Sequence, residues 1–154
     1  MSDYPGGGRI GIVVSRFNES VTTRLLDGAH ACLVERGVAS EQIDVIWGAG
    51  AWELPMLANQ LAGEGGYDAL CALGAVVRGE TPHFDFVAGE AARGLMWIQL
   101  EYNIPVGFGL LTTDTMEQAV ARAGGEHGNK GYDAMAAALD AATEIRKRDG
   151  RPEA

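Results

Sequence analysis

Residues 69–77 read ALCALGAVV, a run in which every position carries an apolar residue or glycine. This run is far shorter than the roughly 20 apolar residues that a membrane-spanning helix needs. Strands of a parallel sheet that is covered by helices on both faces are apolar at nearly every position, whereas half-exposed strands alternate. The run is therefore predicted to be a buried strand of a parallel sheet.

Strands and helices are predicted to alternate on both sides of this run. Three more β-branched or apolar stretches are typical of strands, at 9–14, 43–48 and 105–112. Apolar residues recur at helical spacing after each strand and near the end of the chain, at 21–33, 49–63, 87–102, 114–122 and 135–145. Such alternation implies right-handed crossovers. We expect a flavodoxin-like α/β fold, a three-layer α/β/α sandwich with a central four-stranded parallel sheet.

The chain of 154 residues is predicted to form one domain. No internal repeat and no change of composition divides it, and its length suffices to bury roughly 68–70% of the unfolded surface. We expect a flexible leader over residues 1–8, a single domain over 9–148 and a disordered tail over 149–154.

The composition argues against a nucleic-acid binder and against a metal centre. The formal net charge is -9, and only the short segment EIRKRDGR at 144–151 is locally basic. Cys32 and Cys71 both lie in apolar stretches, without the spacing of a metal site. We interpret them as buried thiols of a cytoplasmic protein. The start of the chain, MSDYPGGGRIG, lacks the pattern of a signal peptide.

Aromatic and ionisable residues gather in the turns that follow the predicted strands. These turns are SRFN (15–18), GAGAWE (48–53), VRGETPH (77–83) and TTD (112–114). In an open parallel sheet all such turns lie at the carboxyl edge, where ligands bind. The sequence therefore predicts a ligand site at that edge.

The turn ending in GETPH has the features of an anion site. Thr81 can cap a helix with its hydroxyl, and Pro82 suits the first helical position. The unpaired amides of a helix start bind phosphate or carboxylate groups. His83 would lie beside such an anion and could carry protons near neutral pH. The alternative is that His83 is only a polar residue at a helix start.

Other candidates remain ambiguous by residue type alone. GAGAWE begins like a dinucleotide-binding GxGxxG motif, but Glu53 stands in place of the third glycine, which argues against nicotinamide binding. Phe17 can either stack on a planar ligand or anchor its own loop. Trp52 and Phe108 are expected to pack in the interior, as large aromatic residues usually do. Arg122 and Lys130, which flank GGEHGNKG, would by themselves be solvated cations.

Taken together, five segments resemble the lumazine synthase family, whose members catalyse the penultimate step of riboflavin biosynthesis. They are RFN, GAWELP, GAVVRGETPHFDFV, PVGFGLLTTDTMEQAVARAG and GNKGYDA. The similarity runs from about residue 9 to 146, with the segments in the family's order. It implies a cofactor-free condensation of 5-amino-6-(D-ribitylamino)uracil with 3,4-dihydroxy-2-butanone 4-phosphate, which yields 6,7-dimethyl-8-ribityllumazine, phosphate and water.

The resemblance also implies roles for individual residues. Phe17 would stack on the pyrimidine ring, and His83 would transfer protons with support from Lys130. Binding of the remaining substrate groups is implied for ten residues: Ala51, Trp52 and Glu53 for the ribityl chain, Ala75, Val76 and Val77 for the ring, Glu80, Thr81 and Arg122 for phosphate, and Phe108 at a neighbouring subunit's site. No metal is implied.

Family members form homopentamers, and some assemble into decamers or sixty-subunit icosahedral shells. Sites would then lie at subunit interfaces, with riboflavin synthase as a candidate partner. The segment ARAGGEHGNKG lacks the extra residues of smaller assemblies, whereas Glu126 replaces a basic residue often found in that turn. The alternative functions are a non-catalytic flavin- or lumazine-binding protein and a shell-forming homologue. SRFNES lacks a flavodoxin's phosphate-wrapping pattern, and the presence of His83 and Arg122 argues against an inactive shell protein.

Overall fold

A computed structural model describes residues 3–150 of the chain. Its central sheet consists of four parallel strands, β1 (Arg9–Ser15), β2 (Ile43–Gly48), β3 (Tyr67–Val77) and β4 (Val106–Thr113). Their order across the sheet is β2-β1-β3-β4. The predicted four-stranded parallel sheet is confirmed, and the run at 69–77 lies in β3, between two neighbouring strands.

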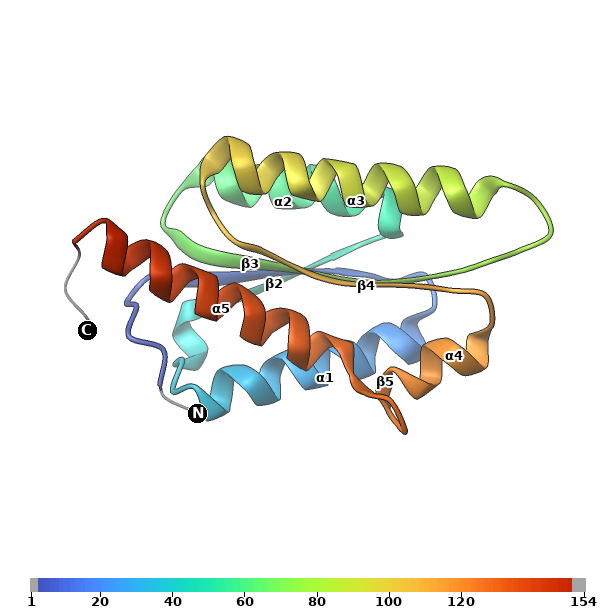
Figure 1. The fold of residues 1–154 in the computed structure, drawn as a ribbon, viewed down its shortest axis with the longest axis horizontal. Helices are drawn as coiled ribbons and strands as arrows, with labels where there is room; N and C mark the ends of the chain where they lie inside the picture. The colour runs from blue at the N-terminus through green and yellow to red at the C-terminus, as the bar shows by residue number, and fades with distance from the viewer. Residues whose placement is uncertain (1–2, 151–154) are drawn as a thin grey trace.

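Helices cover both faces of the sheet (Figure 1). The helices are α1 (Glu19–Glu35), α2 (Leu54–Glu64), α3 (His83–Tyr102), α4 (Met116–Ala121) and α5 (Lys130–Arg148). Short 3-10 turns lie at Ser40–Gln42 and Ala51–Glu53. One face carries α2 and α3, and the other carries α1, α4 and α5 (Figure 1). This is the predicted three-layer sandwich.

The two faces of the sheet have separate apolar cores. Buried residues of β1 and β3 alternate between them, because successive side chains of a strand point to opposite faces. Ile12 and Cys71 pack with α1 and α5, whereas Val13 and Leu70 pack with α2 and α3. Both cysteines are buried and unpaired with each other. Burial raises the pKa of the Cys71 thiol to about 12.

Helix α1 ends at a turn that contains Gly37. This glycine has a φ of 75°, a backbone conformation that residues with a side chain rarely adopt. The amide of Gly37 donates to the carbonyl of Val34 at 3.1 Å, and that of Val38 to Leu33 at 3.0 Å. This pair of bonds is a Schellman motif, which stops the helix and turns the chain toward β2.

The part of the predicted leader that the structure describes lies against the domain. Tyr4 is buried, its amide donates to the carbonyl of Arg36 at 2.8 Å, and its hydroxyl donates to Asp68 at 2.8 Å. Residues 1–2 and 151–154, which belong to the predicted leader and tail, lie outside the described residues.

The glycine-rich segment after α4 contains a small hairpin that the sequence did not predict. It consists of β5 (Ala123–Gly125) and β6 (Gly128–Asn129), which pair antiparallel. Gly124 and Gly128 have positive φ angles in this hairpin. The hairpin leads directly into α5, so it sets where the last helix begins.

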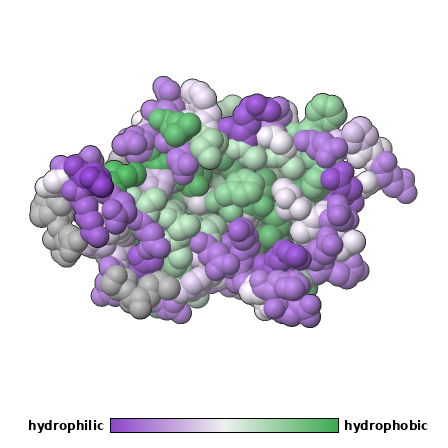
Figure 2. All heavy atoms as spheres, viewed as in Figure 1, coloured by the Kyte–Doolittle hydropathy of each residue, from purple (hydrophilic) through white to green (hydrophobic). Residues whose placement is uncertain are grey.

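Strand β4 forms one edge of the sheet and lies between α3 and α5 on one face of the molecule (Figure 1). Apolar side chains gather in the middle of this face (Figure 2). Phe108 of β4 is 41% exposed, although a position in the interior was expected from its residue type. That expectation is wrong because β4 has no neighbouring strand on this side within the described chain.

Candidate active site

A cavity of about 340 Å³ lies at the carboxyl edge of the sheet. We call it the edge cavity. Eight of the predicted site residues line it: Phe17, Ala51, Trp52, Ala75, Val76, Val77, Thr81 and His83. They come from the turns after β1 and β2, the end of β3 and the start of α3, so four separate segments of the sequence meet there.

A second cavity, of about 310 Å³, lies at the opposite end of the sheet. Tyr4, Asp68 and Arg146 contribute to its wall, and no predicted site residue does. Asp68 already accepts hydrogen bonds from the Tyr4 hydroxyl and from the Gly8 amide, at 2.8 Å and 3.0 Å. These polar groups hold the leader against the domain, so we assign no ligand to this cavity.

The turn after β1 places Phe17 at the mouth of the edge cavity. The amides of Arg16 and Phe17 donate to the carbonyls of Gly48 and Ala49, at 2.8 Å and 3.0 Å, which fixes this turn beside the one after β2. Phe17 is 70% exposed. Its ring therefore does not anchor the loop in the interior, and its face is accessible to a planar ligand.

Asn18 is a site residue that the sequence analysis did not select. It has a φ of 62°, a conformation that asparagine tolerates better than most residues. Its side-chain amide donates to the carbonyl of Ala75 at 2.9 Å. The bond ties the turn that carries Phe17 to the end of β3. The signal in the sequence was a polar residue in the turn between a strand and a helix.

The turn after β2 exposes Trp52 and holds Glu53. Ala51 and Leu54 are buried, and Trp52 between them is 59% exposed, so the expectation that Trp52 packs in the interior is wrong. Glu53 Oε1 accepts a hydrogen bond from the Gly50 amide at 2.9 Å. Glu53 does not line the edge cavity itself, but this bond fixes its carboxylate beside it.

Helix α3 begins at His83, one residue later than predicted. Pro82 is the residue before the first helical turn, and the Thr81 hydroxyl accepts only a long hydrogen bond, 3.4 Å, from the His83 amide. His83 is exposed and lines the edge cavity with Val87, which lies one helical turn further along the same face. Glu80 is exposed and does not line the cavity.

Phe84 and Val87, together with Gly50 and Gly79, complete the wall of the edge cavity. The sequence analysis did not select these four residues. Val87 could have been found from helical spacing, since it follows His83 by four residues. The two glycines offer backbone groups rather than side chains.

Arg78, in the loop between β3 and α3, contacts the end of β4, the loop after β4 and the first turn of α3. Its amide donates to the carbonyl of Thr113 at 2.8 Å, and its Nε donates to Asp114 Oδ1 at 2.9 Å. Its guanidinium carbon lies 4.4 Å from the centre of the Phe84 ring. The hydrogen bond to Asp114 is the main cause that raises the pKa of Arg78 above its ordinary value.

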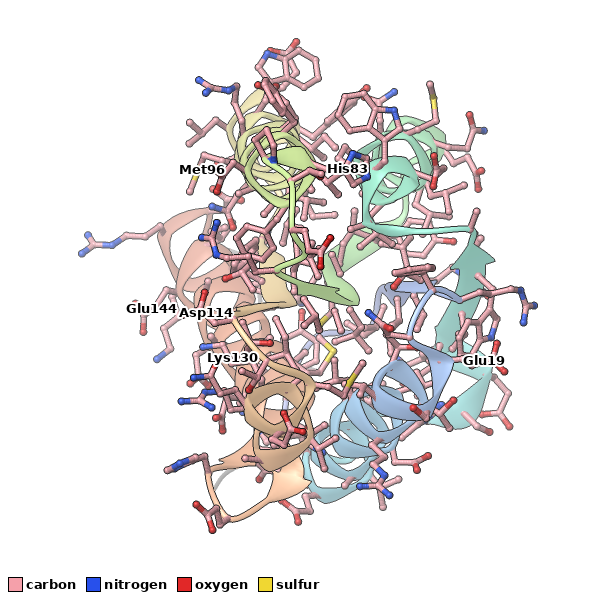
Figure 3. All side chains as sticks on the ribbon, turned by 90° about the vertical axis from the view of Figure 1, so that its right-hand side faces the viewer. Glu19, His83, Met96, Asp114, Lys130 and Glu144 are labelled. Atoms are coloured by element: carbon pink, nitrogen blue, oxygen red, sulfur yellow. The ribbon has the colours of Figure 1, made fainter. Side chains whose placement is uncertain are left out.

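Three predicted residues, Phe108, Arg122 and Lys130, do not reach the edge cavity within one chain. Arg122 ends α4, and its guanidinium donates to the carbonyl of Gln118 at 3.0 Å. The Lys130 amide donates to the carbonyl of Arg122 at 2.8 Å, so the hairpin brings the backbones of these two residues together. Lys130 and His83 lie on opposite sides of the sheet, at the starts of α5 and α3 (Figure 3).

Comparison with known protein families shows to which family the chain belongs. Residues 7–146 match the family model described as 6,7-dimethyl-8-ribityllumazine synthase. The chain belongs to this family. A curated protein of the same name from Gemmatimonas aurantiaca is 59% identical over 145 residues, which cover 91% of this chain and 88% of the relative. Membership of the lumazine synthase family, which the sequence predicted, is confirmed.

The match to the lumazine synthase family includes all the elements that build the edge cavity, from β1 to α3, as well as Phe108, Arg122 and Lys130.

Within residues 3–150, no group of three or more His, Cys, Asp or Glu side chains is arranged to hold a metal ion. None of the described helices is both long and apolar enough to cross a membrane.

Proposed function

We propose that the edge cavity is the active site and that His83 carries protons in it. The observation that supports this proposal is the meeting of Phe17, Trp52, the end of β3 and His83 around one cavity of about 340 Å³. Small-molecule sites usually have volumes of about 300 to 1,000 Å³ and combine apolar walls with a few polar groups.

As a member of its family, the protein is a 6,7-dimethyl-8-ribityllumazine synthase of riboflavin biosynthesis. It condenses 5-amino-6-(D-ribitylamino)uracil with 3,4-dihydroxy-2-butanone 4-phosphate. The 5-amino group attacks the ketone and forms an imine with loss of water. Phosphate then leaves, and the ribityl-bearing nitrogen closes the second ring with loss of another water. These steps need proton transfer and anion stabilisation, and holding both substrates together supplies much of the rate.

The pyrimidine ring is assigned to the space between Phe17 and the end of β3. Phe17 offers an exposed aromatic face, and offset stacking on such a face contributes roughly 0.5 to 1.5 kcal/mol beyond the area that is buried. Ala75, Val76 and Val77 line the opposite wall, where their backbone groups can bond the ring's carbonyl and NH groups. The bond from Asn18 to Ala75 keeps these two walls at a fixed separation.

The ribityl chain is assigned to the turn at Ala51–Glu53. Glu53 already uses Oε1 to accept from the Gly50 amide, which orients the carboxylate. Its other oxygen, Oε2, is proposed to accept from a ribityl hydroxyl. Trp52, exposed beside it, gives the chain an apolar surface on which to lie.

The phosphate of the second substrate is assigned to the start of α3. The helix has 20 residues, and the amides of its first turn lie at the positive end of the helix dipole, where that of Asp85 already donates to the Pro82 carbonyl at 3.0 Å. Backbone amides of Glu80 and Thr81 precede this turn and are proposed to extend the anion site. His83 follows immediately, so its imidazole lies where a proton can reach the leaving phosphate and the imine nitrogen.

Phe108, Arg122 and Lys130 are proposed to complete the edge cavity of a neighbouring subunit. Phe108 lies on the edge strand β4, and Arg122 and Lys130 are joined through their backbones at the hairpin; none of the three lines the cavity of its own chain. Arg122 would pair with the substrate phosphate, and Lys130 would support the charge there. Lys130 is thereby proposed as a catalytic residue that acts across the interface.

The neighbouring subunit is proposed to cover the outer face of α2 and α3. A shallow groove of about 540 Å³ runs between these helices, lined by Trp52, Met56 and Trp97 among others. Contiguous exposed apolar surface of this kind marks an interaction site. Since Trp52 also lines the edge cavity, a subunit bound in this groove would reach the active site.

We propose a homopentamer as the basic assembly, with the family's larger assemblies as open possibilities. A sixty-subunit icosahedral shell is favoured by the compact hairpin between α4 and α5, whereas the acidic Glu126 in that hairpin disfavours it. Riboflavin synthase, whose substrate this enzyme makes, is the proposed partner protein.

The protein is further proposed to act in the cytoplasm, where its two free cysteines would stay reduced. Residues 9–148 are proposed to form its single domain, with short segments at either end.

The test of the proposed function is a turnover assay with both substrates, followed by lumazine absorbance. The wild-type protein is expected to form lumazine without an added cofactor. His83→Ala is expected to lower kcat by roughly a hundredfold or more, because general acid–base groups contribute about that much. His127→Ala removes an exposed histidine of the hairpin as the matched control, and it should leave kcat unchanged.

The outcomes separate the candidate functions. A wild-type protein that binds flavin or lumazine but forms no product would be the binding homologue. One that assembles without binding or turnover would be the shell protein. If His83→Ala matches the wild type in kcat, His83 is not the proton carrier, even if the cavity is the active site.

A further inference from the structure

Arg78 is a charged residue of the site to which the proposed function gives no role. It follows β3 directly, and its side chain spans from the loop after β4 to the first turn of α3. Nε donates to Asp114 Oδ1 at 2.9 Å, and a terminal nitrogen donates to Asp85 Oδ1 at 3.4 Å. The guanidinium also lies over the ring of Phe84, 4.4 Å from its centre. Asp85 and Phe84 are the two residues that follow His83.

An exposed ion pair alone would contribute little, since the median for such pairs is about 0 to 1 kcal/mol. Arg78 differs because four contacts act on one residue: the amide bond to Thr113, the two carboxylates and the aromatic ring. A planar guanidinium can donate within its plane and stack across its face at the same time. The 3.4 Å contact with Asp85 is the weaker of the two ion pairs, so Asp114 and Phe84 are the main partners.

These contacts act on a helix start that has no side-chain cap. Pro82 provides no capping side chain for α3, and the Thr81 hydroxyl accepts only at 3.4 Å. By contrast, α4 and α5 begin with well-formed side-chain caps at Thr115 and Asn129. The first turn of α3 therefore depends on contacts further along, and those are the contacts that Arg78 makes.

We propose that Arg78 is a positioning residue that fixes the first turn of α3, and with it His83 and the phosphate-binding amides, by joining Phe84 and Asp85 to Asp114. This inference rests on the proposed function for the role of His83. It assigns no contact between Arg78 and the substrate. Asp114 is also required, because it holds the guanidinium of Arg78 from the loop after β4.

Substitution of the anchor distinguishes positioning from direct binding of phosphate. Asp114→Asn keeps the positive charge of Arg78 and weakens the hydrogen bond that holds its guanidinium. If Arg78 positions α3, Asp114→Asn and Arg78→Ala should both lower kcat and raise the KM of the ketone phosphate. A fall in kcat of at least about tenfold is expected for Arg78→Ala, because displacements of about 1 Å can cost a hundredfold. Arg78→Lys should resemble Arg78→Ala, since lysine keeps the charge but loses the planar fork.

Hydrogen–deuterium exchange gives a readout that does not depend on turnover. Amides at residues 83–87 should exchange faster in Arg78→Ala and Asp114→Asn than in the wild type, whereas those of α5 should not change. Arg24→Ala removes an exposed arginine of α1 as the matched control, and it should change neither exchange at 83–87 nor kinetics.

Two results would overturn the inference. The first is that Asp114→Asn keeps the wild-type kcat and the wild-type exchange rates at residues 83–87, while Arg78→Ala loses activity. Arg78 would then act through its own charge and not by positioning α3. The other is full activity in Arg78→Lys. Failure of the proposed function would look different: the wild type would form no lumazine, or His83→Ala would keep full kcat, while the exchange measurements would still report on the contacts of Arg78.

Discussion

Asp44 accepts hydrogen bonds from side chains of two other strands. Arg9 of β1 donates through Nε, and Tyr67 of β3 donates through its hydroxyl, both to Asp44 Oδ2 at 2.7 Å. The bond from Arg9 is the main cause that lowers the pKa of Asp44, and the bond from Tyr67 adds to it. A single carboxylate of β2 thereby links three neighbouring strands at the amino edge of the sheet.

This linkage predicts a dependence of stability on acid pH. Because the pKa of Asp44 is lower in the folded chain, its stabilisation is fully present above the unfolded pKa of about 3.9. It is lost as the pH falls through the lower, folded pKa. Asp44→Asn should therefore be less stable than the wild type at pH 7, and the difference should shrink below about pH 4. Urea unfolding at fixed protein concentration from pH 7 to pH 2.5 measures it.

Asp27→Asn, at an exposed position of α1, serves as the control for this prediction. Its stability at pH 7 should lie within about 0.5 kcal/mol of the wild type, as for most exposed positions. A constant difference for Asp44→Asn would show that the ion pair contributes no net stability, as is common for exposed pairs. Asp44 is 31% exposed, so a small effect is expected rather than a large one.

At the residue scale, the sequence predicted which residues belong to the site better than it predicted whether their side chains are exposed. Phe17, Trp52 and Phe108 are all exposed, and residue type alone favoured the interior for the last two. Trp52 points outward because the buried positions beside it are taken by Ala51 in the same turn and by Leu54 at the start of α2. The family resemblance, which assigned Trp52 and Phe108 to a site, indicated their exposure better than hydrophobicity did.

At the scale of elements, α5 crosses α1 at very short range. Asn129 caps α5 by accepting from the amides of Gly131 and Tyr132, and its side chain donates to the carbonyl of Arg24 in α1. A Cβ atom at Gly131 would lie 2.0 Å from the carbonyl oxygen of Leu25. The two helices can lie this close only because residue 131 has no side chain.

Gly131→Ala is therefore expected to destabilise the protein. The obstacle is backbone, which cannot turn aside as a side chain can, so the cost should reach or exceed the upper end of the usual overpacking range, about 3 kcal/mol. Thermal or urea unfolding measures it. Gly89→Ala in α3 is the matched control, because a Cβ atom there meets nothing within 4 Å. That change should stabilise by about 0.5 to 1 kcal/mol. Equal effects of the two substitutions would contradict the close approach of α1 and α5.

Element boundaries could be predicted only where one local signal dominates. The apolar run at 69–77 identified β3. At the start of α4, Asp114 with Glu117 has the spacing of a capping box. The structure uses Thr115 and Gln118. Since Asp114 accepts from Arg78, its carboxylate is occupied by a tertiary contact that the local sequence does not reveal.

The hairpin β5–β6 was missed for a similar reason. Its segment GGEHGNKG has no β-branched residue, and its pairing depends on positive φ angles at glycine. Its importance is positional, because it brings Arg122 and Lys130 together. A rule based on strand propensity could not find that contact.

At the scale of the whole molecule, topology explains why the edge cavity could be predicted. Parallel strands bring all their following turns to one edge, so polar and aromatic residues at 17, 51–53 and 80–83 had to gather there. The same rule says nothing about Arg122 and Lys130, which follow later elements. Their positions away from His83 are consistent with the proposal that a second copy of the chain completes the site.

Mixing of two inactive variants tests this last step. His83→Ala removes the proposed proton carrier, and Arg122→Ala removes the proposed phosphate partner of the neighbouring site, so each variant alone should have little activity. In hybrid assemblies of both, some sites combine an intact His83 from one chain with an intact Arg122 from the next. For random mixing at equal amounts in a cyclic homo-oligomer, about a quarter of the sites are complete, and about a quarter of wild-type activity should return.

The measurement is lumazine formation by co-expressed variants, with native mass spectrometry to establish that hybrids form. Hybrids of His83→Ala with Trp52→Ala provide the contrast, because both residues line the same cavity of one chain. Each cavity takes both residues from a single chain, so every site in this mixture lacks either His83 or Trp52. Activity should therefore stay at the level of the single variants. If the mixture of His83→Ala and Arg122→Ala also stays there although hybrids form, then Arg122 does not act on a neighbour's site, and each chain would have to bind phosphate without it.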